Sequence, residues 1–406
     1  MGARRVAVTG LGAICALGHH TSDVWNTLCA GRPAIGPIHS LDLSRMRFRN
    51  GAQVQRYDPG KYFGAQRTDL LDLFAQFAVI AAREAVQNSG IVLTPELCQK
   101  TAVVTGSCLG GQSTQDAGFV ELYQKGRNRV HPLTIPCTMA NAAASQISME
   151  FGITGPVYTI STACSSANHA IGQAFWMIRQ GIAELAIAGG SEAPFSFGLL
   201  KAWEALRVIS PDTCRPFSQD RRGMILGEGG AMLVLEPLEA AKARGATIYG
   251  ELAGFGMSSD AHHITQPSAQ GPVRAMKAAL SDAGLSPEQI GYINAHGTGT
   301  ISNDPMETRA IRELFGPHAN RLAVSSTKSL HGHALGAAGA LEAVCTILAL
   351  RQGVLPPTAN FTVPDPECDL DVVPNHARTA QVEYALSNAF GFGGLNAVLA
   401  FRAHPD

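Results

Sequence analysis

The stretch Tyr158–His169, YTISTACSSANH, decides how this chain is interpreted. It joins a β-branched apolar run, VYTIST, to a segment with helical spacing, SSANHAIGQAFWMIRQG. Cys164 stands at the junction among Thr, Ala and Ser, whose small side chains permit a sharp strand-to-helix turn. Unpaired N–H groups and the helix dipole favour a thiolate at a helix N-terminus, so we predict a lowered thiol pKa at Cys164. Such a sulfur could attack a thioester without an adjacent base.

The alternative is that Cys164 is a small buried hydrophobe, like Cys345 in LEAVCTILAL. Two later stretches weigh against it. NAHGTGT places His296 after an apolar run, and SSTKSLHGHALGAAGALEA places Lys328 and His333 between a strand pattern and a small-residue helix. Sites in open α/β sheets form where strands end in loops. One Cys and two His at three strand ends therefore predict one site.

The remaining histidines offer two competing interpretations. His331 is an alternative to His333, since HGH contains both. His169, His262 and His263 could be added to form a metal site, but no spacing here resembles H-E-x-x-H or another metal-binding pattern. We therefore expect packing or surface roles for these three histidines, and no bound metal.

Short β-rich runs alternate with longer helical patterns along the whole chain. RRVAVTG, TAVVTGS and ELAIAGG are typical of strands, and DLFAQFAVIAAREAVQNSG and GPVRAMKAALSDAGL of helices that end at a glycine. Apolar strands between helices indicate parallel sheets covered on both faces. The rhythm restarts after a short helix in EPLEAAKARGATIYG, so we expect a duplicated α/β unit divided near residue 250.

Bulk composition excludes several classes of protein. The chain has 406 residues, 46% of them hydrophobic, and a net charge of -1, so nothing global points to nucleic acid or an anionic membrane. No uninterrupted apolar run approaches the roughly 18 residues of a membrane helix. Its nine cysteines are scattered without a C-x-x-C pair, which fits a reducing cytoplasm rather than a disulfide framework.

Taken together, the motifs resemble an elongating β-ketoacyl-acyl carrier protein synthase, the decarboxylating condensing enzyme of fatty-acid and polyketide assembly. The resemblance runs over essentially the whole chain, from RRVAVTGLG through TACSS, GGSEA, GFGMSSDAHH, NAHGTGT and STKSLHGHALGAAGALEA to SNAFGFGGLNAVLAF. It implies a thiolase-like α/β fold, with two duplicated βαβαβ halves in a five-layered α/β/α/β/α body that dimerises. Residues 1–250 would carry the nucleophilic Cys and residues 251–406 the two catalytic His.

The same resemblance assigns the chemistry. Cys164 would take the acyl chain from its carrier, and His296 and His333 would hydrogen-bond the malonyl carbonyl as CO2 leaves. Two histidines argue for the elongating type over a thiolase, which has a second Cys in place of one His. Lys328 would act electrostatically near His333. No metal, nucleotide or flavin is implied, because substrates arrive on the phosphopantetheine of acyl carrier protein.

Supporting roles follow from the family pattern. The backbone N–H groups of Cys164 and Phe392 would form an oxyanion hole, and Phe392 would also gate acyl entry. Glu342 belongs to the Lys328 network in the family. Asp304 and Glu307 would support the site, and Thr298 and Thr300 would bind the phosphopantetheine arm.

Two further groups of residues concern the partner and the substrate. An acidic carrier protein would dock on basic residues, for which the candidates are Arg67, Lys125, Arg127, Arg129 and Arg207; the alternative is ordinary solvated charge. The acyl pocket would include Cys108, Leu109 and Thr134. Cys108 stands where a Gly is usual and Thr134 where the family often has an aromatic. We therefore expect a long, or unsaturated and rod-like, acyl chain from a specialised polyketide, aryl-polyene or nodulation-factor pathway.

Several rival functions share part of this pattern. A housekeeping synthase of fatty-acid elongation has the same catalytic residues, and the motifs do not separate the two. The chain could pair with itself, or act as the catalytic subunit beside a chain-length-factor-like partner. A non-catalytic scaffold subunit would lack the nucleophile, and a cysteine hydrolase would need a base beside Cys164.

Overall fold

The strands fall into two sets of five that repeat one topology. In the computed structural model, which describes residues 4–404, the sheet order is β10-β9-β13-β14-β8-β1-β7-β6-β4-β5. The first set is β1 (Val6–Cys15), β4 (Thr101–Gly106), β5 (Val157–Ile160), β6 (Leu185–Glu192) and β7 (Gly229–Pro237). The second set is β8 (Gly250–Ser259), β9 (Ile290–Asn294), β10 (Ala323–Ser325), β13 (Tyr384–Gly391) and β14 (Leu395–Arg402).

The duplication expected from the sequence rhythm is confirmed by this topology. Numbered in chain order, both sets have the spatial order 1-5-4-2-3. In both, the first two pairings are antiparallel and the last two are parallel. The sets meet where β1 pairs antiparallel with β8 over Val6–Val8. The proposed units, residues 1–250 and 251–406, stay a prediction.

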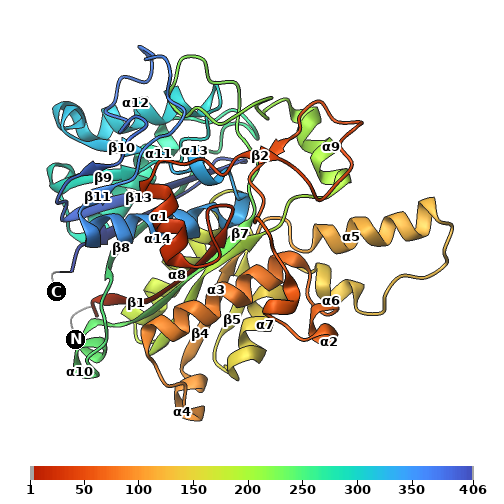
Figure 1. Ribbon diagram of the computed structural model, residues 1–406. Coiled ribbons are helices and arrows are strands. Elements are labelled where there is room, and N and C mark those ends of the chain that lie inside the picture. The colour runs from red at the N-terminus through yellow and green to blue at the C-terminus, as the bar shows by residue number, and fades with distance from the viewer. Residues whose placement is uncertain (1–3, 405–406) are drawn as a thin grey trace.

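Helices separate the two sets of strands and cover their outer faces, as Figure 1 shows. On the first set lie α3 (Leu73–Ser89) and α7 (Ala142–Phe151), and on the second α11 (Gln270–Ala283) and α12 (Asn303–Phe315). Between the sets, α8 (Ser166–Arg179) and α14 (Ala338–Gln352) each contact strands of both. This is the five-layered arrangement expected for a thiolase-like fold.

Glycines let the outer helices approach the strands in the same way in both halves. A Cβ added to Gly12 in β1 would lie 2.0 Å from the carbonyl oxygen of Ala81 in α3. A Cβ added to Gly256 in β8 would lie 2.1 Å from the carbonyl oxygen of Ala275 in α11. Both contacts are too short for any side chain, so each helix needs glycine beneath it.

The central helix α14 is mostly apolar around its circumference because it is enclosed, although it carries the buried Glu342. Within residues 4–404, one stretch, Leu335–Gln352, is long and apolar enough to cross a membrane, and 89% of it is buried inside the protein. A helix that is hydrophobic all round is expected in the core of a large protein.

The remaining elements are short or peripheral. The helix α5 (Gln112–Phe119) continues into a π-helical turn, η2 (Val120–Gln124), and projects from the body at the right of Figure 1. The other helices are α1 (Thr21–Cys29), η1 (Pro59–Lys61), α2 (Ala65–Thr68), α4 (Pro95–Gln99), α6 (Thr134–Thr138), α9 (Phe197–Leu206), α10 (Leu238–Ala243), η3 (Pro287–Gln289), η4 (Gly316–Asn320), α13 (Lys328–His331) and η5 (Leu335–Ala337). Two small ribbons pair β2 (Gly36–Pro37) with β3 (Asn50–Gly51) and β11 (Val354–Leu355) with β12 (Arg378–Thr379).

Candidate active site

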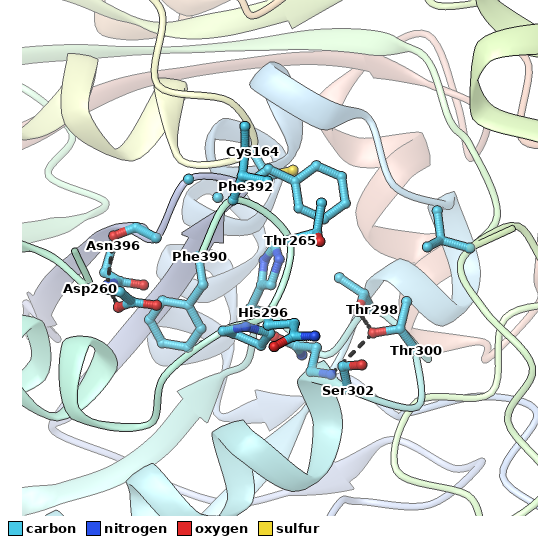
Figure 2. Close-up of a pocket in the computed structure, with 18 of the residues that line it drawn as sticks. Cys164, Asp260, Thr265, His296, Thr298, Thr300, Ser302, Phe390, Phe392 and Asn396 are labelled. Atoms are coloured by element: carbon cyan, nitrogen blue, oxygen red, sulfur yellow. Dashed lines mark hydrogen bonds between the residues drawn. The ribbon is translucent and has the colours of Figure 1, made fainter. Parts of the chain in front are cut away.

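Three segments that are distant in sequence line one cavity. Cys164 lies between β5 and α8, His296 follows β9, and His333 follows α13. All three line a cavity of about 110 Å³ together with Phe392 (Figure 2). The structure thus brings together the cysteine and the two histidines that the sequence singled out.

A strained turn presents Cys164. Ala163 has φ 51°, in the left-handed region that residues with a Cβ seldom occupy. The Ser166 hydroxyl holds this turn closed, since it accepts from the Thr162 N–H at 2.9 Å and donates to the Ala163 carbonyl at 2.6 Å. Backbone strain of this kind costs of order 1–3 kcal/mol and persists where the surroundings enforce it.

The predicted lowering of the Cys164 pKa is wrong. Burial raises the pKa of this thiol to about 11, because desolvation of the thiolate outweighs the Lys328 ammonium and the backbone N–H of Phe392, which both lower it. The side chain is only 8% exposed, so the helix N-terminus alone does not compensate for the lost hydration. The resting group is therefore the neutral thiol.

The two N–H groups expected to form an oxyanion hole both act on the Cys164 sulfur. The backbone N–H groups of Phe392 and of Cys164 itself each lower the pKa of the thiol. Gly391 makes this approach possible, since a Cβ there would lie 2.8 Å from the Thr162 carbonyl oxygen. Phe392 is 36% exposed, and its ring stacks on that of Trp203 at 6.1 Å between ring centroids, so it is not a core residue.

The rings of His296 and His333 lie edge to face in the cavity. Their ring centroids are 5.5 Å apart at 84°. The His333 Nδ1 accepts the backbone N–H of Leu335 at 3.1 Å, which assigns the proton of the neutral ring to Nε2. Burial, followed by the charge of Lys328, holds the pKa of both His296 and His333 well below the usual value.

The competing histidine His331 lies outside the cavity. Its Nε2 is 3.0 Å from the Thr327 hydroxyl, and burial lowers its pKa to about 3. Of the two histidines in HGH, His333 alone lines the cavity.

A buried ion pair supplies charge behind the histidines. Lys328 and Glu342 are both fully buried and pair with each other. Burial raises the pKa of Glu342 to about 7, although Lys328 opposes the rise. Since Lys328 lowers the pKa of both histidines, its effect on the site is electrostatic.

Two carboxylates of α12 hold the loop that carries His296. Glu307 accepts the backbone N–H groups of His296 and Gly297 at 2.9 and 2.8 Å. Asp304 accepts those of Phe217 and Gly299 at 2.8 and 3.2 Å. These hydrogen bonds fix the backbone of the loop, and a supporting role of the two carboxylates in catalysis stays a prediction.

Thr298 and Thr300 line the cavity, whereas the expected acyl-pocket residues lie outside it. The two threonine hydroxyls are 2.9 Å apart (Figure 2). Cys108 donates its S–H to Glu192, and Leu109 packs against a neighbouring apolar cluster. Thr134, at the start of α6, donates to the carbonyl oxygen of His131 at 2.7 Å.

The basic residues expected to receive a carrier protein are largely paired. Arg67 pairs with Glu150 on α7. Lys125 and Arg127 both pair with Glu121. The last two candidates, Arg129 and Arg207, are exposed. This surface is therefore less cationic than the sequence suggests.

Sequence reasoning missed the residues that hold the Phe392 loop. The Asn396 amide donates to Asp260 at 2.7 Å, and the backbone N–H of Gly393 donates to the Ile264 carbonyl at 2.8 Å. It also missed Glu192, which accepts five hydrogen bonds at the end of β6. Only GGSEA pointed to Glu192, and its partners are distant in sequence.

No metal site is visible in the described part of the chain. Across residues 4–404, no group of three or more His, Cys, Asp or Glu side chains could hold an ion. That the protein needs no cofactor stays a prediction.

Comparison with known proteins agrees with this geometry. The model for the N-terminal domain of β-ketoacyl synthase matches residues 3–241, and that for the C-terminal domain matches residues 249–362. Nodulation protein E of Rhizobium sp. (strain N33) is 49% identical over 98% of this chain and 99% of its own. 3-Oxoacyl-[acyl-carrier-protein] synthase 2 of Synechocystis sp. is 43% identical over 99% of this chain and 98% of its own. The ishigamide ketosynthase/chain length factor structure has a TM-score of 0.94 and 35% identity, with complete coverage of both chains.

Proposed function

Because this chain belongs to the β-ketoacyl synthase family, we propose that it joins a Cys164-bound acyl chain to malonyl-acyl carrier protein in a decarboxylative Claisen condensation. The product is a β-ketoacyl chain two carbons longer, still on its carrier. The observation that carries this proposal is that Cys164, His296 and His333 line one cavity, with the Phe392 N–H beside the sulfur.

In the first half-reaction, the Cys164 sulfur attacks the carbonyl carbon of the acyl thioester. The developing oxyanion accepts the backbone N–H groups of Cys164 and Phe392. The intermediate then collapses, the C–S bond to phosphopantetheine breaks, and the carrier thiol leaves with a proton. Since the resting group is a thiol, its proton must depart as the new C–S bond forms.

In the second half-reaction, the bond between the malonyl carboxylate and its α-carbon breaks. CO2 leaves and the electron pair becomes an enolate, whose oxygen accepts hydrogen bonds from His296 and His333. Preplaced donors of this kind contribute about 3–4 kcal/mol each. The enolate carbon attacks the acyl-Cys164 carbonyl, a C–C bond forms, and the Cys164 sulfur departs as a thiolate, which takes up a proton from solvent to restore the resting thiol. Neutral histidines suit this role because each keeps one N–H to donate.

For the acyl group we propose a long or unsaturated chain. Similarity to nodulation protein E at 49% identity favours a specialised pathway. Thr134 and Cys108, which the family resemblance assigns to the acyl pocket, lie outside the cavity that Cys164 lines, so they do not add to this support. The second candidate is housekeeping fatty-acid elongation, favoured by the 43% identity to a 3-oxoacyl-[acyl-carrier-protein] synthase 2.

We further propose that the protein works as a dimer and receives an acidic carrier protein. Strand β5 is an edge of the sheet, bonded to β4 on one side. Apolar side chains nearby are exposed in the single chain, among them Ile135, Tyr158 and Met149 at 67%, 37% and 65%. An open edge with apolar neighbours is suited to a second chain, either identical or a chain-length-factor-like subunit.

Intact-protein mass spectrometry tests the reaction. The protein is mixed with a series of acyl-carrier proteins and then with malonyl-carrier protein. We expect one acyl adduct, absent in Cys164→Ala, and its conversion to a β-ketoacyl product two carbons longer. The chain that gives most adduct distinguishes specialised from housekeeping roles. If no chain gives adduct or product, even after a related partner subunit is added, the proposal is wrong.

A further inference from the structure

Glu192 is a fully buried carboxylate surrounded by hydrogen-bond donors. Its Oε1 accepts the Ser107 hydroxyl at 2.9 Å and the Leu109 N–H at 3.2 Å. Its Oε2 accepts the Cys108 N–H at 2.9 Å, the Cys108 S–H at 3.1 Å and the Gly336 N–H at 3.1 Å. All five partners donate, which favours the ionised carboxylate, whereas burial raises the pKa of Glu192 despite these hydrogen bonds.

These donors come from two segments that the proposed reaction uses differently. Ser107, Cys108 and Leu109 form the loop after β4, where the acyl pocket is expected. Gly336 lies three residues after His333, in the turn that orients its ring. One side chain on β6 therefore connects the loop after β4 to the turn that follows His333.

The glycine in this cluster is required by space. A Cβ on Gly336 would lie 2.5 Å from Glu192 Oε2 and 2.6 Å from the Cys108 nitrogen. The position therefore accepts no side chain while the carboxylate holds its partners. The carboxylate of Glu192 thus has donors from Ser107, Cys108 and Leu109 on one side. On the other side it has the backbone N–H of Gly336, which no side chain blocks.

We propose that Glu192 is a positioning residue that holds the Ser107–Leu109 loop and the His333 turn in fixed relation around Cys164. The inference deepens the proposed function and rests on it. Cys108 contributes by donating its S–H to the carboxylate, so its sulfur is held by Glu192 and the backbone of Leu109 is fixed beside it.

The titration of the Cys164 thiol distinguishes an effect of the Glu192 charge from a purely structural role. Glu192 raises the pKa of the Cys164 thiol through its negative charge, in addition to the larger effect of burial. Glu192→Gln keeps the side-chain size but replaces one acceptor oxygen with an NH2 group that faces donors. The neutral amide should therefore disturb both segments and also move the titration of Cys164 to lower pH.

The experiment compares Glu192→Gln with wild-type protein and a matched control. Iodoacetamide modification of Cys164 is measured between pH 7 and 11 by peptide mass spectrometry, with buried Cys345 as an internal monitor of unfolding. We expect Glu192→Gln to react at least about threefold faster at pH 8 at Cys164 and unchanged at Cys345. Acyl transfer and malonyl decarboxylation should each fall about tenfold or more, since buried donors lose their acceptor.

Glu228→Gln is the control, because Glu228 is also a buried carboxylate but accepts the Val54 N–H and lines a different cavity. It should leave the Cys164 titration unchanged. The inference is overturned if Glu192→Gln keeps the wild-type rates of Cys164 alkylation, acyl transfer and malonyl decarboxylation. It is also overturned if Glu228→Gln changes the alkylation and the two reaction rates as much as Glu192→Gln does. Failure of the proposed function is separate: wild-type protein would then form no acyl adduct or product, while the alkylation comparison still tests Glu192.

Discussion

The backbone N–H of Leu335 donates to His333 Nδ1 at 3.1 Å, and this contact leaves Nε2 as the atom that carries the proton. A histidine fixed in this way can donate to a developing enolate oxygen but cannot act as a base through Nδ1. We therefore expect His333 to serve decarboxylation and condensation rather than acyl transfer.

His333→Ala should separate the two half-reactions. The acyl adduct on Cys164 should still form, while condensation falls about 10²–10³-fold because one oxyanion donor is lost. Adduct mass and product formation are measured on the same samples. His331→Asn is the control, since His331 lies outside the cavity; if it reduces condensation equally, the assignment of roles within HGH is wrong.

The rate of Cys164 alkylation should not level off near neutral pH. Because burial raises the thiol pKa to about 11, the thiolate fraction grows about tenfold per pH unit below that value. The rate with iodoacetamide should therefore keep rising between pH 7 and 10. A rate that levels off near pH 7 would instead support the lowered Cys164 pKa that the sequence predicts.

Glu342→Gln should destabilise the protein strongly, because it leaves the Lys328 ammonium buried without its carboxylate. Breaking a buried ion pair costs about 3–5 kcal/mol in the free energy of unfolding. Denaturant unfolding measures this loss. The double variant Lys328→Met/Glu342→Leu should recover much of the stability but not the condensation activity, which depends on the charge of Lys328.

Glu228 should make stability depend on pH. Burial raises its pKa from 4.5 to about 8, so the unfolded chain releases this proton first as pH rises. The stabilisation is complete below pH 4.5 and falls by about 1.4 kcal/mol per unit until pH 8. Glu228→Gln should flatten this part of the pH–stability curve, which denaturant unfolding at pH 5, 6.5 and 8 would show.

Thr134→Phe should shift acyl preference toward shorter chains if Thr134 lies at the floor of the acyl pocket. The measurement is the distribution of Cys164 adducts from an equimolar mixture of acyl-carrier proteins. Thr138→Phe, one turn later on α6, is the matched control. An unchanged distribution in Thr134→Phe, peaking at short saturated chains, would remove the case for a long or unsaturated substrate.

The sequence predicted those features that depend on short stretches. Cys164, His296 and His333 each follow a recognisable strand pattern, and the strand–helix rhythm predicted the duplication. Lys125 also had a readable partner, because Glu121 stands four residues before it on a helical segment. The paired basic surface could thus have been foreseen in part.

Features that depend on tertiary packing were not predictable in this way. The pKa of Cys164 follows from burial, which the strand-to-helix pattern does not determine. Glu192 meets donors 83 to 144 residues away. Arg67 meets Glu150 from another helix. In each case the local pattern leaves the partner undefined until the layers are assembled.

The repeated topology brings different side chains to equivalent positions on the two sides of this site. Cys164 follows the third strand of the first set, and Lys328 follows the third strand of the second. His296 follows the second strand of its set, as Ser107 does in the other. The two halves share one backbone topology but place different side chains at these paired positions, a thiol against an ammonium and a hydroxyl against an imidazole. The asymmetry of the site therefore lies in its side chains and not in the scaffold that carries them.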